Sequence, residues 1–419
     1  MLVHQREASA VLAVLSALCL AAAGAENAAD MNSMDGAVSW LESEAHRIIR
    51  ASKRNMKDGT SAFPPQVGIH YEAFWLRDYE YTLEGSISSY SDQELLDAAR
   101  LFVKSINSDG AGVDCVRFDG TPIYMPGYGS MGTNPVADGS QFTVGVVWHT
   151  YRKTTNETLL NEVLDPLVRT LNSVPRNPET GLVFIDPSQD WDRCPYGFTD
   201  TIRKQGDVLF CSLLYVQACR QLSDLLRAGG RLEASRKWSE EGVRVTAGIR
   251  KSLWDTEAGL FRAATVRCRE HDIWGSAFAV FLGVATPEQS KAIAQYFEAH
   301  YDQLVQHGQI RHLPGGVYWE QGCERDEYQN GAYWATPVGW FVYTLDIANP
   351  ALADRTVIDM VAHVQQYGAC EWIFGGKRQL PHYLASAALP LSGIRAMLDR
   401  RKKALRNTKP DKPDSHGAP

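Results

Sequence analysis

The chain has 419 residues, 44% of them hydrophobic and 22% charged, and its formal net charge at neutral pH is −7. This composition excludes a mainly disordered protein, and the acidic balance, with Lys and Arg scattered except near the C-terminus, argues against nucleic acid as a partner. After the N-terminal region no uninterrupted apolar run is long enough to span a bilayer, so we expect no stable membrane anchor.

The N-terminal segment, residues 1–25, has the pattern of a secretory signal peptide. His4 and Arg6 precede a short apolar, Ala-rich run, and Ala23-Gly24-Ala25 fits a cleavage site. We therefore expect an exported protein, cleaved after Ala25. Residues 26–404 are predicted to form one catalytic domain, and residues 405–419, rich in Lys, Pro, Asp and Ser, a disordered tail.

Apolar residues recur with a helical period along most of the chain. Ser91-Asp92-Gln93-Glu94 has the form of a capping box, and Pro287 and Pro350 stand at expected first helical positions. The predicted helices cover 35–54, 72–88, 91–107, 139–154, 156–174, 205–228, 232–254, 272–284, 287–301, 331–347, 350–366 and 382–402.

The connections between these helices alternate between a few residues and long stretches rich in Gly, Pro and aromatics. Short connections force neighbouring helices to be antiparallel, so every long connection must emerge at the same end of the helix stack. Six hairpins with the irregular chain at one end describe an all-α (α/α)6 toroid. An open solenoid of helical hairpins is the alternative, but it would show a fixed repeat length, and we find none.

Cysteine usage gives no sign of a metal site. Loss of Cys19 with the signal leaves seven cysteines, an odd number, so at least one thiol is expected to be free. The chain has no Cys-x-x-Cys pair and no His at ligand spacing. We therefore expect no metal and no cofactor.

Three motifs combine aromatic and charged residues in the way that sugar binding requires. They are Phe74-Trp75-Leu76-Arg77-Asp78, Asp190-Trp191-Asp192 and Cys370-Glu371-Trp372-Ile373-Phe374, and each falls at the predicted long-connection end. An aromatic ring packs on the apolar face of a sugar, while Arg and Asp bind its hydroxyls. The alternative for each motif alone is a surface ion pair or a loop turn.

These motifs resemble those of the six-hairpin glycosidase superfamily, which includes glucoamylases, trehalases, neutral invertases and processing α-glucosidases. The first resembles a Trp-x-Arg-Asp element, and Gln189-Asp190-Trp191-Asp192-Arg193, with Gly197-Phe198-Thr199 after it, is similar to the general-acid loop. Tyr328-Gln329-Asn330-Gly331-Ala332-Tyr333-Trp334 and Glu371-Trp372-Ile373-Phe374 resemble later elements, the last of which supplies the general base. The resemblance spans residues 70–395 in motif order.

The resemblance implies Asp192 as the general acid and Glu371 as the general base of an inverting hydrolase. Asp190 is the alternative acid, and Glu320, Glu324 and Glu327 are rival bases. Sugar contacts are expected from the aromatic and polar residues that surround these carboxylates. The expected substrate-binding residues are Trp75, Arg77, Asp78, Trp191, Gln141, Tyr328, Asn330, Trp334 and Trp274, although Trp274 fits the core equally well.

The predicted function is therefore an exported glycoside hydrolase that acts on the nonreducing end of an oligosaccharide, most simply an α-glucoside. One alternative is another enzyme on the same barrel: a hydrolase of other sugar specificity, a lyase or an epimerase. A lyase or an epimerase would depend on Tyr, His or Arg instead of two carboxylates. A noncatalytic carbohydrate-binding or interaction toroid is the alternative from a different class. It predicts that Asp192 and Glu371 do not face each other.

Overall fold

The computed structural model describes residues 33–407. The predicted signal peptide and most of the predicted tail lie outside these residues. The described chain is mainly helical, with short strands between the helices. The helices are α2 (Met34–Ser52), α3 (Leu76–Ser86), α4 (Asp92–Lys104), α5 (Pro126–Gly129), α6 (Gly139–Thr154), α7 (Glu157–Asn172), α8 (Leu209–Ala228), α9 (Leu232–Ser252), α10 (Ile273–Phe281), α11 (Pro287–Ala299), α12 (Tyr301–Leu304), α13 (Val338–Leu345), α14 (Pro350–Tyr367), α15 (Leu384–Ala388) and α16 (Pro390–Asn407).

Every predicted helical segment contains one of these helices, and the local start signals are confirmed. Ser91 and Glu94 form the reciprocal capping box at the start of α4. Thr286 caps α11 in the same way, with Pro287 in its first turn. Each cap satisfies backbone N–H groups that the first helical turn leaves unpaired.

The boundaries of several helices differ from the prediction; for example, the helix expected from residue 331 begins at Val338 and that expected from residue 205 begins at Leu209. The helix expected from residue 72 begins at Leu76, because Ala73–Trp75 pair as a strand. The last hairpin is divided before Pro390, whose ring cannot continue the hydrogen bonding of α15. The helix α16 then runs to Asn407, past the predicted end of the domain at residue 404.

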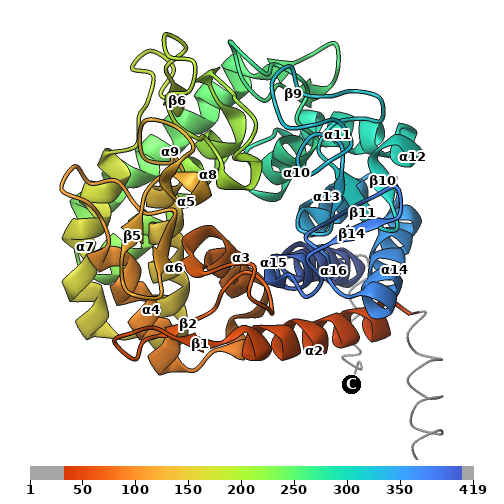
Figure 1. Ribbon diagram of the computed structural model, residues 1–419. Coiled ribbons are helices and arrows are strands. Elements are labelled where there is room, and N and C mark those ends of the chain that lie inside the picture. The colour runs from red at the N-terminus through yellow and green to blue at the C-terminus, as the bar shows by residue number, and fades with distance from the viewer. Residues whose placement is uncertain (1–32, 408–419) are drawn as a thin grey trace, which may run out of the picture.

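The long helices pack in a ring. In chain order α3 packs on α6, α6 on α8, α8 on α10, α10 on α13 and α13 on α16, while α15 and α16 pack back on α3. Further helices pack outside them, and α2, α7 and α14 lie at the periphery (Figure 1). One hydrophobic cluster extends from Ala37 to Met397 and joins these helices into a single core.

The connections contain short strands that an all-α prediction omits. The strands are β1 (Arg54–Asn55), β2 (Ser61–Ala62), β3 (Ala73–Trp75), β4 (Cys115–Arg117), β5 (Pro122–Ile123), β6 (Phe184–Ile185), β7 (Gly206–Asp207), β8 (Trp254–Asp255), β9 (Leu260–Phe261), β10 (Val305–Gln306), β11 (Gln309–Arg311), β12 (Tyr333–Trp334), β13 (Trp372–Phe374) and β14 (Lys377–Gln379). All pairs are antiparallel, and β10 to β14 form one five-stranded sheet in chain order.

This sheet brings together two motifs that are far apart in sequence. Tyr333 of β12 pairs with Ile373 of β13, so the Tyr328–Trp334 motif lies beside the Glu371–Phe374 motif. Strands of two or three residues are too short to show an alternating pattern, which is why periodicity missed them.

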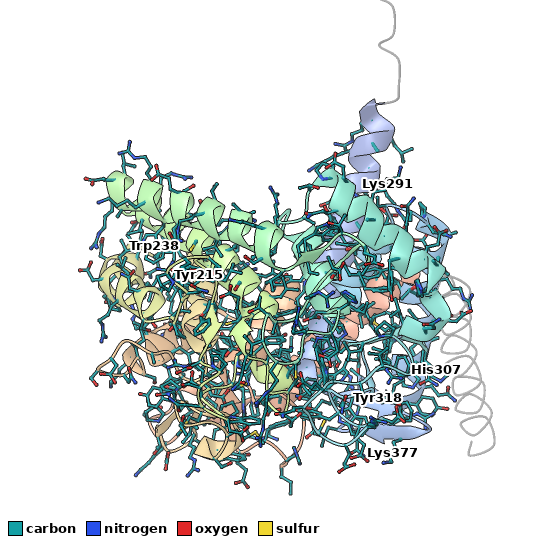
Figure 2. All side chains as sticks on the ribbon, turned by 90° about the horizontal axis from the view of Figure 1, so that it is seen from above. Tyr215, Trp238, Lys291, His307, Tyr318 and Lys377 are labelled. Carbon is teal, nitrogen blue, oxygen red and sulfur yellow. The ribbon has the colours of Figure 1, made fainter. Side chains whose placement is uncertain are left out.

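The long connections lie toward one end of the ring. Figure 2 shows Tyr318 and Lys377, which belong to two such connections, at the end opposite Lys291 of α11. In residues 33–407 no helix combines the length and apolar character needed to cross a membrane.

Candidate active site

The floor of the site is a buried guanidinium with three carboxylates around it. Arg77 is 5% exposed, and its Nη1 donates a hydrogen bond to Asp114 Oδ1 at 2.6 Å. Burial opposes the charge, but Asp114, Asp138 and Asp78 together raise the pKa of Arg77 well above its usual range. Gly197 gives Arg77 its space, because a Cβ there would lie 1.9 Å from the guanidinium carbon.

Two of these carboxyls carry raised pKa values. Burial raises the pKa of Asp78 to about 6, although Arg77 and a hydrogen bond from the Tyr383 hydroxyl counteract it. Burial likewise raises the pKa of Asp138 to about 6, and its Oδ2 accepts a hydrogen bond from the Gly197 amide at 2.8 Å. The floor thus concentrates negative charge in a space that water does not fill, which perturbs further acids nearby.

Glu371 lies at the start of β13, where the backbone of β14 fixes it. Its amide donates to the Gln379 carbonyl at 2.9 Å. The side chain is buried, with 4% of the residue exposed, and its Oε1 accepts a hydrogen bond from the Tyr71 hydroxyl at 2.6 Å. Burial raises the pKa of Glu371 to about 8; the Tyr71 hydrogen bond lowers it, while the charges of Asp78 and Asp200 raise it further.

Asp200 is a second perturbed acid, and the sequence analysis did not select it. It follows the short helix η2 (Gly197–Thr199), and its Oδ1 accepts a hydrogen bond from Gln329 Nε2 at 3.0 Å. Burial raises the pKa of Asp200 to about 6 against the opposing effects of Gln329 and Arg77. The signal was present, since Gly197-Phe198-Thr199 had been matched to the acid loop and Asp200 is the next residue.

Tyr328 places its hydroxyl within the electrostatic influence of both acids. Burial raises the pKa of its hydroxyl well above the usual range, and the charges of Asp200 and Glu371 are the next largest causes. Its φ of 43° lies in the left-handed region, which is uncommon for an aromatic residue. Trp334 holds this conformation through a hydrogen bond from its indole Nε1 to the Tyr328 carbonyl at 3.0 Å. Such strained positions concentrate at functional sites.

The two acids selected from the sequence have different surroundings. Asp192 is buried, and its Oδ1 accepts a hydrogen bond from Asn134 Nδ2 at 2.6 Å while its Oδ2 lies 3.4 Å from Arg193 Nε. The side chain of Asp190 is 72% exposed and forms ion pairs with Arg203 and Arg267. These partners hold the Asp190–Asp192 loop in place.

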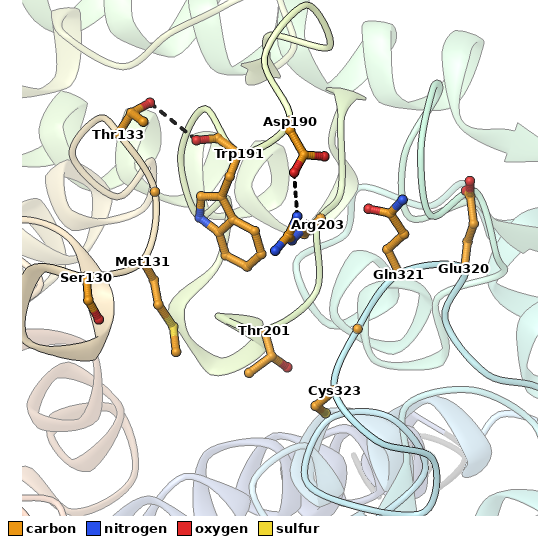
Figure 3. Close-up of a pocket in the computed structure, with 12 residues that line it drawn as sticks. Ser130, Met131, Thr133, Asp190, Trp191, Thr201, Arg203, Glu320, Gln321 and Cys323 are labelled. Atoms are coloured by element: carbon orange, nitrogen blue, oxygen red, sulfur yellow. Dashed lines mark hydrogen bonds and ion pairs between the residues drawn. The ribbon is translucent and has the colours of Figure 1, made fainter.

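A cavity of about 880 Å³, which we call the acid-side cavity, has Thr201, the residue after Asp200, in its wall. The walls comprise Ser130–Thr133, Asp190, Trp191, Thr201, Arg203 and Glu320–Cys323. Figure 3 shows the indole of Trp191 and the side chain of Arg203 next to each other in this wall, and the guanidinium carbon lies 4.3 Å from the ring centre. A cavity of this size fits a small organic ligand.

Several predicted sugar contacts are buried as structural supports. Trp274 is 1% exposed and stacks on His312, and Trp334 is 0% exposed. Gln141 donates to the Ala137 carbonyl in the core. Asn330 receives the Trp319 amide and donates to the Cys323 carbonyl. These side chains are buried and hold the loops, and their role as sugar contacts stays a prediction.

Trp75, in contrast, belongs to an aromatic group close to Glu371. Its ring centre lies 4.9 Å from that of Tyr71 and 5.7 Å from that of Tyr128, both in edge-on geometry. Tyr71 also lines a smaller cavity of about 370 Å³ with Arg117 and Glu72. Tyr71, which donates a hydrogen bond to Glu371, therefore also lines this smaller cavity.

The rival bases Glu320, Glu324 and Glu327 lie nearer the surface. Glu327 forms an ion pair with Lys377 at 2.6 Å, and Glu320 accepts the Cys268 amide at 3.0 Å. Glu324 is exposed. Their accessibility favours Glu371, because a buried carboxylate has the stronger perturbation that acid–base chemistry uses.

A buried ammonium supports the loop that carries Asp200. Lys204 is 2% exposed, donates to Thr199 Oγ1 at 3.2 Å and lies 4.6 Å above the Trp319 ring. Burial lowers the pKa of Lys204, while Asp272 counteracts this. Trp319 in turn donates its indole N–H to the Gln329 carbonyl. Lys204 and Trp319 therefore also hold Gln329, the residue that donates a hydrogen bond to Asp200.

The seven described cysteines are all free. Within residues 33–407 no group of three or more His, Cys, Asp or Glu side chains is arranged to hold a metal ion.

No protein-family profile and no curated protein matches the chain, but its fold matches solved structures. The GH63 mannosylglycerate hydrolase from Thermus thermophilus, in complex with glucose, aligns with a TM-score of 0.61 at 18% identity, over 84% of this chain and 99% of that one. A rhamnosidase from Klebsiella oxytoca with bound rhamnose aligns with a TM-score of 0.59 at 14% identity, over 87% and 64%.

A GH78 rhamnosidase from Bacillus aligns with a TM-score of 0.56 at 15% identity, covering 85% of this chain and 34% of that one. At such low identity these matches establish the architecture alone. The chain therefore has the fold of the six-hairpin glycosidases, the superfamily that its motifs indicated.

Proposed function

We propose that the ring of helices is a complete (α/α)6 toroid and that the protein is a glycoside hydrolase. The observation that carries this proposal is a pair of acids, the partly buried Asp200 and the buried Glu371, at the two sides of the Tyr328–Trp334 motif. Gln329 of this motif donates to Asp200, and Tyr333 pairs with Ile373 in the strand that follows Glu371. The two acids stand on separate long connections, and Thr201, the residue after Asp200, lines the acid-side cavity. Paired titratable groups with perturbed pKa values are the common mark of an acid–base site.

In the proposed reaction Glu371 is the general base and Asp200 the general acid. Glu371 takes a proton from a water whose oxygen attacks the anomeric carbon, and Asp200 gives its proton to the departing glycosidic oxygen. The products are a sugar with inverted configuration and an alcohol. Inverting enzymes place the two carboxyls roughly 6.5–9.5 Å apart, which leaves room for the water.

We propose Asp200 for the acid role that was predicted for Asp192, because Asp200 and Asp78 both act on Glu371 and Asp78 is held by the Tyr383 hydroxyl. Asp192 is instead occupied by Arg193 and by a hydrogen bond from Asn134. Asp192 is the second candidate, and Asp190, exposed between two arginines, is the third.

With a pKa of about 6 for Asp200 and about 8 for Glu371, Glu371 holds a proton more tightly than Asp200 does. The proposed reaction needs this proton on Asp200. Bound substrate supplies the bias, because the glycosidic oxygen accepts a hydrogen bond only from a protonated acid, and the attacking water donates one to an ionised base. Coupled acids titrate as a pair, so both arrangements of the proton have the same pH profile.

The proposed substrate is a nonreducing-end glycoside, of which an α-glucoside is the first to test. Among the structurally similar proteins, one is a mannosylglycerate hydrolase solved with glucose and one is a rhamnosidase solved with rhamnose. These sugars are ligands of those proteins. Export with cleavage after Ala25 remains part of the proposal, supported by the sequence of residues 1–25.

The test is a panel of aryl glycosides with the wild-type chain and four variants, Asp200→Asn, Asp192→Asn, Asp190→Asn and Glu371→Gln. We expect Glu371→Gln and Asp200→Asn to lower kcat by about 10²–10⁴-fold or more with the fold retained, and Asp190→Asn to have little effect. Full activity of Asp200→Asn with loss in Asp192→Asn would transfer the acid role to Asp192. Product configuration, read by NMR, decides inversion.

If all carboxyl variants keep activity while Tyr71→Phe and Tyr328→Phe lose it, the protein is a lyase or epimerase on this fold. No turnover of any glycoside by the wild-type chain would leave a binding protein.

A further inference from the structure

A second cavity of about 770 Å³, which we call the rim cavity, lies where the connection after α12 meets α11 and the loop before α10. It is lined by Tyr296, His300, Arg269, Glu270, Gln303 and Glu320, among others. The catalytic residues proposed above do not line it. Its volume is in the range of small-molecule sites.

One wall of the rim cavity is a fixed aromatic platform. The rings of Tyr296 and His300 stack with centres 4.0 Å apart and planes 19° apart. His300 Nδ1 lies 2.9 Å from the Tyr296 carbonyl oxygen, which fixes the imidazole plane. A platform that is already ordered loses little conformational entropy when a ligand packs on it.

Groups that bind hydroxyls lie around this platform. Arg262 and His271 both bind Asp255, so these three side chains hold each other. Glu270 Oε1 accepts the Glu320 amide at 2.6 Å, but Glu270 Oε2 is buried with no hydrogen-bond partner. The Glu270 carboxylate is thus held at the wall of the rim cavity by its contact with Glu320. Arg269 is exposed at the same edge.

Glu320 belongs to the walls of both the rim cavity and the acid-side cavity. Its amide is held by Glu270 and its Oε2 by the Cys268 amide, so it is fixed between the two. Figure 3 shows Glu320 on the far side of the acid-side cavity from Ser130 and Met131. The two cavities therefore meet at Glu320, and the acid-side cavity also has Thr201, the neighbour of Asp200, in its wall.

We propose that the rim cavity is a distal sugar subsite and that the substrate is an oligosaccharide of several units, not a glycoside of a small alcohol. The leaving-group side of the chain would occupy the acid-side cavity and pass Glu320 to reach the Tyr296–His300 platform. This inference rests on the proposed hydrolase function. An aromatic face with Arg and carboxylate groups around it is suited to the apolar face and hydroxyls of a pyranose.

The test compares a short and a long substrate of the sugar that the aryl glycoside panel identifies. For an α-glucoside these are the p-nitrophenyl glucoside and maltoheptaose. Tyr296→Ala and Arg269→Ala should each lower kcat/KM on the long substrate by about tenfold and leave the aryl glycoside unchanged. Arg269 is exposed, so its replacement keeps the test free of folding defects. Lys291→Ala, exposed on the same helix α11, is the matched control and should change neither.

Equal effects of the two variants on both substrates, or no effect on either, would overturn the distal subsite while the hydrolase function stands. Absence of turnover on every glycoside in the wild-type chain would overturn the proposed function and the subsite with it.

Discussion

Tyr71→Phe isolates one hydrogen bond at the proposed base. The hydroxyl donates to Glu371 Oε1 at 2.6 Å and is the contact that opposes the effect of burial on this carboxyl. Phenylalanine keeps the ring and its edge-on contact with Trp75. The substitution therefore removes the donor and leaves the packing.

The magnitude follows from this single contact. A hydrogen bond to a charged group contributes about 1.5–3 kcal/mol, and one pKa unit corresponds to about 1.4 kcal/mol. Loss of the donor should raise the pKa of Glu371 by about 1–2 units above its value of about 8. Because the proposed mechanism needs Glu371 ionised and the acid protonated, the productive fraction, and with it kcat/KM, should fall by about 10–100-fold.

The assay is kcat/KM against pH for the aryl glycoside that the panel identifies. In Tyr71→Phe the alkaline limb should move to higher pH while the acid limb stays in place. Tyr367→Phe, at a partly exposed position on α14, is the control and should reproduce the wild-type profile. An alkaline limb that moves down, or a loss of activity with no change in either limb, would refute the assignment of Tyr71 to the carboxylate of Glu371.

Three further predictions follow from the same residues. The wild-type kcat/KM should be bell-shaped with limbs near pH 6 and pH 8, the values of Asp200 and Glu371; a flat profile across this range would exclude the pair. Because folding raises the pKa of Glu371, the contribution of this carboxyl to stability is present at pH 4 and is lost as pH rises to about 8. Glu371→Gln should therefore raise Tm relative to wild type at pH 8 and not at pH 4. Thermal unfolding at the two pH values shows whether Tm changes in this direction. Gly197→Ala should displace Arg77, lower the free energy of unfolding by about 1–3 kcal/mol in denaturant unfolding, and lower activity. Gly315→Ala is the control, because the added Cβ would lie 3.4 Å from its nearest neighbouring atom, and it should leave stability and activity unchanged.

The helical framework could be predicted because its causes are local. Each long helix has an apolar face and many have a cap, as Ser91 and Glu94 show at α4. Arg77 lies in the first turn of α3, although this helix begins at Leu76 and not at residue 72 as predicted. Periodicity and capping act within a few residues, so a single sequence displays them.

The chemistry of the site depends on contacts that a single sequence does not display. Arg77 was expected to bind sugar hydroxyls, but Asp114, from the next long connection, pairs with it. Asp200 directly follows the Gly197-Phe198-Thr199 motif, but the rise in its pKa comes from burial, against the hydrogen bond from the distant Gln329. Whether a carboxyl is desolvated is decided by the tertiary fold, so a single sequence leaves the choice of general acid open.

The cysteines give the protein a natural position for a reporter group. Burial raises the pKa of six thiols, those of Cys115, Cys194, Cys211, Cys219, Cys268 and Cys370. Cys323 is only partly buried and lines the acid-side cavity. Since alkylating reagents need an accessible thiolate, a maleimide dye should attach first at Cys323. The wild-type sequence would then carry a fluorophore at the wall of the acid-side cavity. The emission of this dye should report ligand binding without any engineered residue.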